Sequence, residues 1–203
     1  LYLGAMGDLY CLDVSSGKPI WSISLPKTYQ AGIPIWGFAA HPLKYRDWYI
    51  CLAGGKGSVA VALDRATGKE IWRSLELENP GNEIGYCPPM LFEFGGKQQL
   101  IIWHPEAVNG LDPETGKPLW RVPFKLKANL AIPTPRKGGD RLFITSFYNG
   151  SILIEIPPGK PTEARVVWKG TGRGEFPEQT SDLHAIMCNP WIQDGKVYGV
   201  CSY

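Results

Sequence analysis

The sequence predicts an all-β fold made of four-stranded antiparallel units that repeat about every fifty residues. The first observation is a recurring stretch that reads Leu-Asp, three residues, Gly-Lys, two residues and Trp. The second is a composition with 24 Gly, 18 Pro and 8 Trp among 203 residues, which indicates many tight turns. The third is that no segment shows a helical hydrophobic period, which argues against parallel βαβ folds.

The recurring stretch has the chemistry of a tight turn between two strands. An Asp at the end of a strand accepts hydrogen bonds from backbone groups just after it. Gly four residues later tolerates the positive φ that such a turn needs. Three clear copies and a degenerate fourth begin at Asp13, Asp64, Asp112 and Glu155, and their tryptophans, Trp21, Trp72, Trp120 and Trp168, are spaced by 51, 48 and 48 residues.

Each unit is expected to hold four strands, and short turns rich in Gly and Asn join them. The expected strands are 1–5, 9–14 and 20–25; 36–44, 48–53, 58–64 and 70–77; 86–94, 99–103, 107–112 and 119–124; 131–136, 142–147, 151–156 and 164–169; and 184–192 and 196–202. The units therefore span 1–25 (partial), 36–77, 84–124, 129–169 and 183–203 (partial).

A second marker repeats with the same period. The first strand of each unit carries a proline, and proline belongs on an edge strand because it has no N–H to donate to a ladder. The innermost strand of a β-propeller blade is such an edge. We therefore predict a β-propeller with about four blades present, and we expect this segment to form part of a larger seven- or eight-bladed ring. The prolines are Pro42, Pro89, Pro135 and Pro190.

Composition narrows the classes of partner. The net charge is only +2, from 21 basic and 19 acidic residues, which argues against a nucleic-acid partner. No window approaches eighteen consecutive apolar residues, so no membrane span is expected in this segment. The five cysteines are scattered in apolar strand contexts, and we interpret them as small buried side chains.

The repeated Leu-Asp-Gly-Lys-Trp stretches resemble the repeat of the PQQ-like β-propellers, a superfamily typified by quinoprotein alcohol dehydrogenases. The resemblance covers nearly the whole chain. Segments such as 36–43 and 57–61 look most like uncharacterised exported bacterial members. The resemblance implies a periplasmic or otherwise exported protein, and it implies that Trp21, Trp72, Trp120 and Trp168 dock between adjacent blades.

The resemblance leaves two functions open, because the same repeat occurs in dehydrogenases and in non-enzymatic relatives such as the propeller lipoprotein of outer-membrane assembly. In the dehydrogenases, pyrroloquinoline quinone lies in the central funnel near a disulfide between adjacent cysteines, and acidic and amide residues hold calcium. This sequence has no adjacent cysteine pair. No cofactor is therefore expected, with the quinone and calcium as the alternative.

Several residue patterns suggest chemistry at first sight. The acidic residues of the repeated turns are interpreted as turn caps, because they occupy one structural position in every unit. Gly54 to Ser58 lacks the spacing of a phosphate-binding loop and is interpreted as a hairpin turn. His41, His104 and His184 have no Cys or acidic partner at ligand spacing, so no metal site is expected.

Loops between blades are the best candidates for binding, because they are long and unlike one another. The longest, 170–183, is expected to dominate. The predicted binding face comprises Trp36, His41, Tyr86, Asn129, Arg173, Glu175, Glu178, His184 and Asn189.

The function predicted from these observations is a non-catalytic exported scaffold that binds a protein or small-molecule ligand at the inter-blade loop face. The alternative is a fragment of a quinoprotein dehydrogenase that oxidises an alcohol or a sugar. A third hypothesis is a sensor or interaction domain fused to another module.

Overall fold

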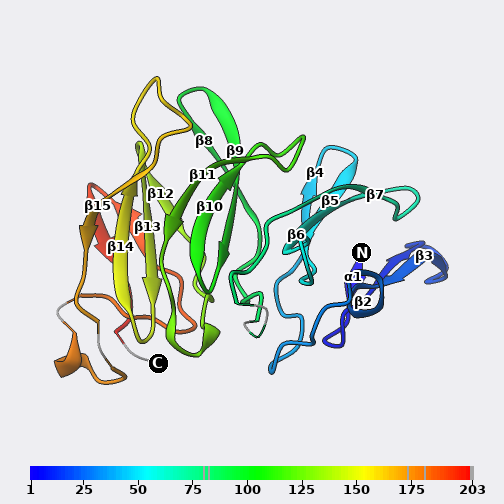
Figure 1. The fold of residues 1–203 in the computed structure, drawn as a ribbon, viewed down its shortest axis with the longest axis horizontal. Coiled ribbons are helices and arrows are strands. Elements are labelled where there is room, and N and C mark those ends of the chain that lie inside the picture. The colour runs from blue at the N-terminus through cyan, green and yellow to red at the C-terminus, as the bar shows by residue number, and fades with distance from the viewer. Residues whose placement is uncertain (80, 82, 173, 181, 202–203) are drawn as a thin grey trace.

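The computed structural model describes residues 1–203 except 80, 82, 173, 181, 202 and 203. Within them, seventeen strands form one three-stranded, three four-stranded and one two-stranded antiparallel sheet, each a simple meander. The sheets stand side by side along the chain (Figure 1). This arrangement confirms the predicted all-β fold class of four-stranded antiparallel blades.

The elements follow the predicted order. The first sheet holds β1 (Tyr2–Leu3), β2 (Asp8–Leu12) and β3 (Pro19–Ser24), and helix α1 (Leu25–Tyr29) follows it. The second holds β4 (Leu43–Tyr45), β5 (Trp48–Leu52), β6 (Ala60–Asp64) and β7 (Glu70–Ser74). The third holds β8 (Met90–Phe94), β9 (Lys97–His104), β10 (Ala107–Leu111) and β11 (Pro118–Pro123). The fourth holds β12 (Arg136–Gly138), β13 (Arg141–Ser146), β14 (Gly150–Glu155) and β15 (Arg165–Lys169), and β16 (Trp191–Gln193) pairs with β17 (Lys196–Tyr198). The 3₁₀ turns η1 (Lys127–Asn129) and η2 (Pro177–Gln179) lie in the connections before and after the fourth sheet.

The first strand of each blade is shorter than predicted. Each of β4, β8, β12 and β16 begins directly after its proline, so the prolines precede these strands and do not lie within them. The residues upstream bond to a neighbouring unit: Phe38 N–H donates to Ala5 O at 2.9 Å, and Tyr86 N–H donates to Ala131 O at 2.8 Å. These bonds join adjacent blades where an ordinary ladder was expected.

Three of the four repeated turns confirm the capping prediction, and the fourth corrects it, because the Glu155 carboxylate pairs with Arg141 and Arg165. Asp64 Oδ1 accepts from the backbone N–H of Ala66 at 3.1 Å and of Thr67 at 2.8 Å, and Asp13 and Asp112 accept in the same way. The φ angles of Gly17, Gly68 and Gly116 are 68°, 70° and 70°, a region in which a side chain would be strained.

Two tryptophans lie against the turn of the next blade. Trp21 Nε1 donates to Arg65 O at 2.9 Å, and a Cβ added at Gly68 would lie 2.7 Å from its ring. Trp72 is 8% exposed, donates to Pro113 O at 3.2 Å and lies in the same way over Gly116. The turn glycines therefore leave the space that each ring fills.

The third junction uses a different arrangement. Trp120 Nε1 donates to Gln99 Oε1 at 2.7 Å, and Gln99 Nε2 donates to Pro161 O of the next blade at 2.7 Å. Extra residues in the degenerate fourth turn displace its glycine, so a buried amide bridges the distance. Trp168 differs again: it is 44% exposed on β15, where every residue is exposed.

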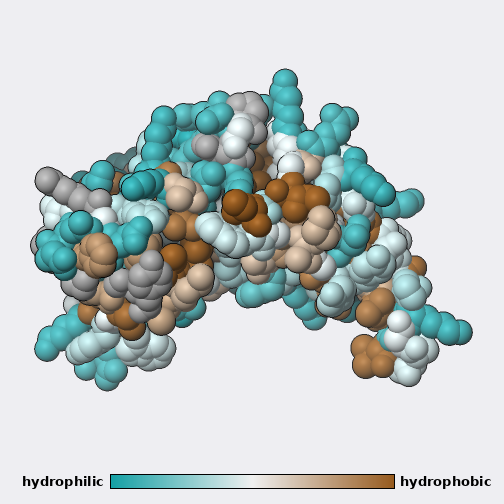
Figure 2. All heavy atoms as spheres, turned by 90° about the horizontal axis from the view of Figure 1, so that it is seen from below, coloured by the Kyte–Doolittle hydropathy of each residue, from teal (hydrophilic) through white to brown (hydrophobic). Residues whose placement is uncertain are grey.

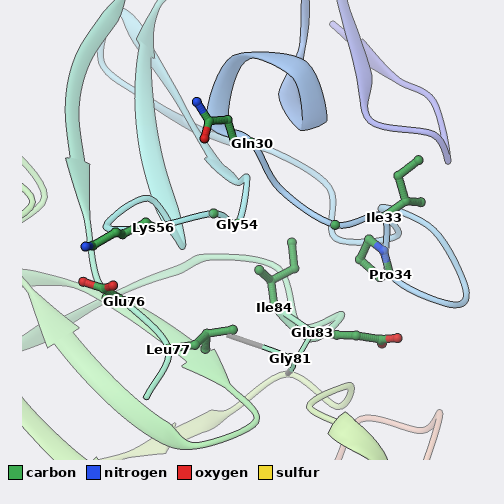
Figure 3. Close-up of a pocket in the computed structure, with 12 residues that line it drawn as sticks. Gln30, Ile33, Pro34, Gly54, Lys56, Glu76, Leu77, Gly81, Glu83 and Ile84 are labelled. Carbon is green, nitrogen blue, oxygen red and sulfur yellow. The ribbon is translucent and has the colours of Figure 1, made fainter. Parts of the chain in front are cut away.

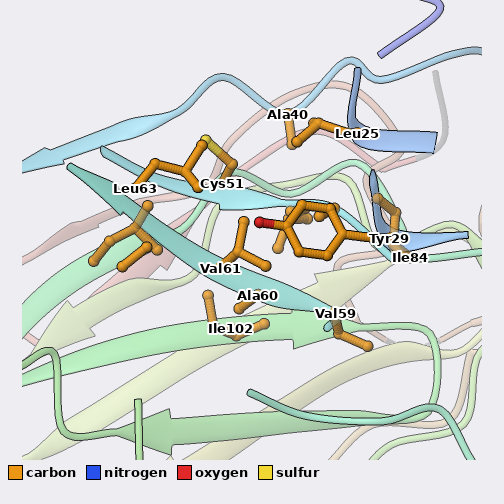
Figure 4. Packing of buried hydrophobic residues seen from close by; sticks show 14 of the residues in the cluster. Leu25, Tyr29, Ala40, Cys51, Val59, Ala60, Val61, Leu63, Ile84 and Ile102 are labelled. Carbon is orange, nitrogen blue, oxygen red and sulfur yellow. The ribbon is translucent and has the colours of Figure 1, made fainter. Parts of the chain in front are cut away.

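The core lies between the sheets. One buried cluster joins the first two sheets and α1 to the third, with Leu63, Val61 and Ile102 fully buried or nearly so (Figure 4). A second cluster joins the third and fourth sheets. Of the five cysteines, Cys51 and Cys87 are buried as expected, whereas Cys188 and Cys201 are exposed, which corrects the prediction for that pair.

Candidate functional site

The inter-blade loops gather at one end of the sheets, and Figure 2 views the molecule from that side, where apolar side chains are exposed near the middle. A pocket of about 420 Å³ opens on this face. Its residues come from the segments that precede β4, β8, β12 and β16 and from the turn between β13 and β14. Its lining is Trp36, Ala39, Tyr86, Ala128, Leu130, Ile132, Phe147, Tyr148, Ile186 and Met187. We call this the aromatic pocket.

One wall of the aromatic pocket is held by a partly buried acid, Glu83. Trp36 is 60% exposed and meets Tyr86 edge to face, with ring centroids 5.5 Å apart. The Tyr86 hydroxyl donates to Glu83 Oε2, and Glu83 Oε1 accepts from Ile35 N–H at 2.9 Å. Burial, followed by the bond to Glu83, raises the pKa of the Tyr86 phenol, which therefore stays protonated. Glu83 thus fixes both aromatic rings of this wall.

The opposite wall is the turn between β13 and β14. Phe147 and Tyr148 pack edge to face at 4.9 Å. Lys127 Nζ lies 4.5 Å from the centre of the Tyr148 ring, and the Tyr148 hydroxyl donates to Glu175 Oε1 at 2.8 Å. The Asn149 side chain anchors the turn, because its Oδ1 accepts from Lys127 N–H at 3.0 Å. The long loop 170–183 therefore supports this wall through Glu175.

His184 lies beneath the pocket, fully buried and stacked on Phe147 with ring centroids 6.2 Å apart. The preceding carbonyl, Leu183 O, accepts from Ser151 Oγ at 2.6 Å and from Thr145 Oγ1 at 3.1 Å. Within the described chain, His184 Nε2 has no hydrogen-bond partner. The imidazole therefore serves as a flat packing surface under the aromatic rings.

The structure brings together only part of the predicted binding face. Trp36 and Tyr86 line the pocket, His184 supports Phe147, and Glu175 bonds to Tyr148. Asn129 lies between two lining residues, with a φ of 58° and its carbonyl accepting from Ala131 N–H.

Four predicted residues lie apart from the pocket lining or outside the described structure. His41 is exposed beside Pro42, and Glu178 is exposed on η2. Asn189 is occupied elsewhere, because its Oδ1 accepts from Thr134 N–H at 2.7 Å. Arg173 falls outside the described residues.

Eight of the ten residues that line the pocket went unpredicted, among them Phe147, Tyr148, Ile186 and Met187. Phe147 and Tyr148 directly precede the Asn149-Gly150 turn, and two aromatic residues at that position are a signal that the sequence does carry. Residues at a turn tip are usually polar, so apolar residues there indicate binding or packing.

The acidic side chains of the repeated turns do not form a catalytic pair. Hydrogen bonds from the Ser15 and Ser16 hydroxyls lower the pKa of Asp13 to about 2, so its carboxylate is a poor base at neutral pH. Within the described residues, no group of three His, Cys, Asp or Glu side chains forms a metal site.

A family model described as outer membrane protein assembly factor BamB matches residues 1–201. The chain belongs to this family of PQQ-like β-propellers. No curated protein showed a significant match to the sequence.

Solved structures share the propeller fold at low sequence identity. BamB from Moraxella catarrhalis is 17% identical with a TM-score of 0.56, and the match covers 91% of this chain and 46% of that one. The C-terminal domain of Pseudomonas aeruginosa PilY1 is 16% identical with a TM-score of 0.57, over 94% of this chain and 49% of that one. The quinohemoprotein alcohol dehydrogenase ADHIIG from Pseudomonas putida HK5 is 16% identical with a TM-score of 0.54. The match covers 96% of this chain and 36% of that one. This PQQ-like propeller therefore spans less than half the length of each.

None of the helices in the described part of this PQQ-like propeller is long and apolar enough to cross a membrane.

Proposed function

We propose that this PQQ-like propeller is an exported, non-catalytic scaffold that binds an apolar segment of a partner polypeptide in the aromatic pocket. The observation that carries the proposal is the chemistry of the lining. None of its ten residues carries a carboxylate, amide, imidazole or thiol, and exposed Trp36 and Met187 flank the opening. Exposed aromatic and methionine side chains are typical of surfaces that bind proteins.

The match to a family described by an outer-membrane assembly factor supports the same proposal and its exported location. Trp36 and Met187 are both exposed in the lining of one pocket, and clustered exposed apolar side chains mark surfaces that another molecule covers. A pocket of about 420 Å³ is large enough for one or two apolar side chains of a partner, within the range of roughly 300–1,000 Å³ typical of binding sites.

The alternative is a quinoprotein dehydrogenase fragment. Quinone-bound calcium needs oxygen ligands such as carboxylates and amides. The aromatic pocket lining supplies none of these groups, which supports the scaffold over the dehydrogenase for this pocket. We expect no change in melting temperature when pyrroloquinoline quinone and calcium are added. A rise of several degrees at micromolar quinone would favour the dehydrogenase.

A labelled peptide tests the proposed function. The probe is a fluorescein-labelled peptide of Gly and Ser with a central Leu-Phe-Leu block, and its reference has Ser in those three positions. We expect fluorescence anisotropy to show binding of the apolar peptide alone. Met187→Glu should weaken binding at least about tenfold, because a charge at the opening must be desolvated.

The matched control is Met6→Glu, because Met6 and Met187 are similarly exposed, at 61% and 68%, and Met6 does not line the pocket. It should leave the affinity unchanged. Equal binding of the two peptides, or equal losses in the two variants, would refute the proposal.

A further inference from the structure

A second pocket on the loop face is lined by charged and apolar groups together. It has a volume of about 570 Å³ and lies between α1, the β5–β6 turn and the loop that follows β7 (Figure 3). We propose that this pocket binds a free aliphatic α-amino acid, independently of the aromatic pocket.

Glycines allow the walls of this second pocket to approach each other. Gly54 and Gly55, in the β5–β6 turn, have φ angles of 82° and 80°. A Cβ at Gly55 would lie only 2.0 Å from Tyr29 O, and one at Gly54 would lie 3.0 Å from Ile84 Cγ2. The turn can therefore hold the end of α1 and the loop around Ile84 only because both residues lack a side chain.

Strained backbone shapes two further sides of the pocket. Leu75 has a φ of 67° and Gln30 a φ of 52°, which are uncommon for residues with a side chain. Leu75 is held there because its carbonyl accepts from Val59 N–H at 3.1 Å. Its turn directs the following Glu76 and Leu77 into the lining. Such strain persists where the surrounding structure imposes it, and it is concentrated at functional sites.

Two opposite charges lie on the same side of the pocket. Figure 3 shows the Lys56 ammonium and the Glu76 carboxylate on that side, and both residues line the pocket. Neither group is ion-paired or hydrogen-bonded through its side chain to another described residue. Glu83, by contrast, already accepts from Ile35 N–H and from the Tyr86 hydroxyl. One cation and one anion thus remain to receive an ammonium and a carboxylate carried by one small molecule.

Apart from Gln30, Glu83 and the glycines, the rest of the lining is apolar. Leu77 and Ile84 lie next to the charged pair, with Ile33 across the pocket from it (Figure 3). An α-amino acid carries its ammonium and carboxylate on one carbon and its side chain on the same atom. Its head group would meet Lys56 and Glu76 while an aliphatic side chain covers the apolar groups.

Isothermal titration calorimetry with L-leucine tests the proposal. Isoamylamine lacks the carboxylate, and 4-methylpentanoate lacks the ammonium. We expect L-leucine alone to give a saturable heat, with a dissociation constant in about the micromolar-to-millimolar range. Lys56→Met and Glu76→Gln should each weaken L-leucine binding at least about tenfold.

The matched controls are Lys97→Met and Glu93→Gln, at exposed positions of the β8–β9 hairpin. They should leave L-leucine binding unchanged, and all four variants should melt like the parent protein because their side chains are exposed. The proposal is overturned if L-leucine gives no saturable heat at about 10 mM, a concentration above the dissociation constant expected of a weak site. Equal binding by either analogue, or unchanged binding in Lys56→Met and Glu76→Gln, overturns it as well.

Discussion

The two ends of the blades are stabilised by different kinds of contact. At the end that carries the repeated turns, one geometry recurs: Asp caps the turn, Gly takes a positive φ, and the tryptophan of the preceding blade covers it at Gly68 and Gly116. At the loop end, every connection differs in length and in contacts. Glu83 holds one wall of the aromatic pocket, and Glu175 supports the other.

This difference indicates how one scaffold carries both stability and recognition. Repeated contacts at the turn end hold the blades together whatever the loops contain. Loops are consequently able to change sequence and shape without loss of the fold. If this division is correct, matched substitutions at the two ends should have unequal effects on stability.

The largest expected effect is that of Trp72→Ala. Trp72 is 8% exposed between two blades, and its removal should lower the free energy of unfolding by about 3–5 kcal/mol. The matched control is Trp36→Ala at the loop end, where the ring is 60% exposed and the loss should be about 1 kcal/mol. Urea unfolding measures both. Equal losses would remove the distinction between the ends.

Low pH should destabilise the loop end through a buried histidine. His104 is 1% exposed at the end of β9, and burial lowers its pKa from 6.5 to about 4. The unfolded chain binds a proton below pH 6.5 while folded His104 remains neutral. His104 therefore costs no stability above about pH 6.5, and the free energy of unfolding falls by roughly 3 kcal/mol as the pH falls towards 4.

The comparison variant for this pH effect is His104→Asn, which can keep an acceptor for the Glu106 N–H that now donates to Nδ1 at 3.3 Å. Its free energy of unfolding should depend less on pH between 6.5 and 4. Exposed His41→Asn should retain the parent's slope. The same slope in His104→Asn would assign the pH effect to other groups.

The turn end was predictable from sequence because its determinants are local. Asp112 and Gly116 act within one turn, and the register of three repeats makes the pattern visible. The aromatic pocket was only partly predictable, because Trp36 and Phe147 come from blades far apart in the chain and meet only after the sheets pack. The Gln99 bridge was also missed, because a buried amide between blades has no sequence period.

A smaller effect is expected from adding one methyl group to a turn glycine. Gly116→Ala must place a Cβ at a φ of 70° and 2.6 Å from Trp72, so it should cost about 2 kcal/mol or more. Gly159→Ala is the matched control, since its φ is 75° but no atom lies within 4 Å, so only the backbone strain remains, at about 1 kcal/mol. A thermal melt of each variant checks this. Equal costs would show that the contact with the tryptophan ring adds nothing.

The smallest effect separates two acids in the loop 170–183. Glu178 is exposed on η2, so Glu178→Lys should change the free energy of unfolding by less than about 0.5 kcal/mol. Glu175 accepts from the Tyr148 hydroxyl at 2.8 Å, so Glu175→Lys should cost about 1 kcal/mol and loosen one wall of the aromatic pocket. Binding of the Leu-Phe-Leu peptide should therefore weaken in Glu175→Lys alone. If the two reversals weaken it equally, the loop acts through its overall charge, and the contact with Tyr148 does not position the wall.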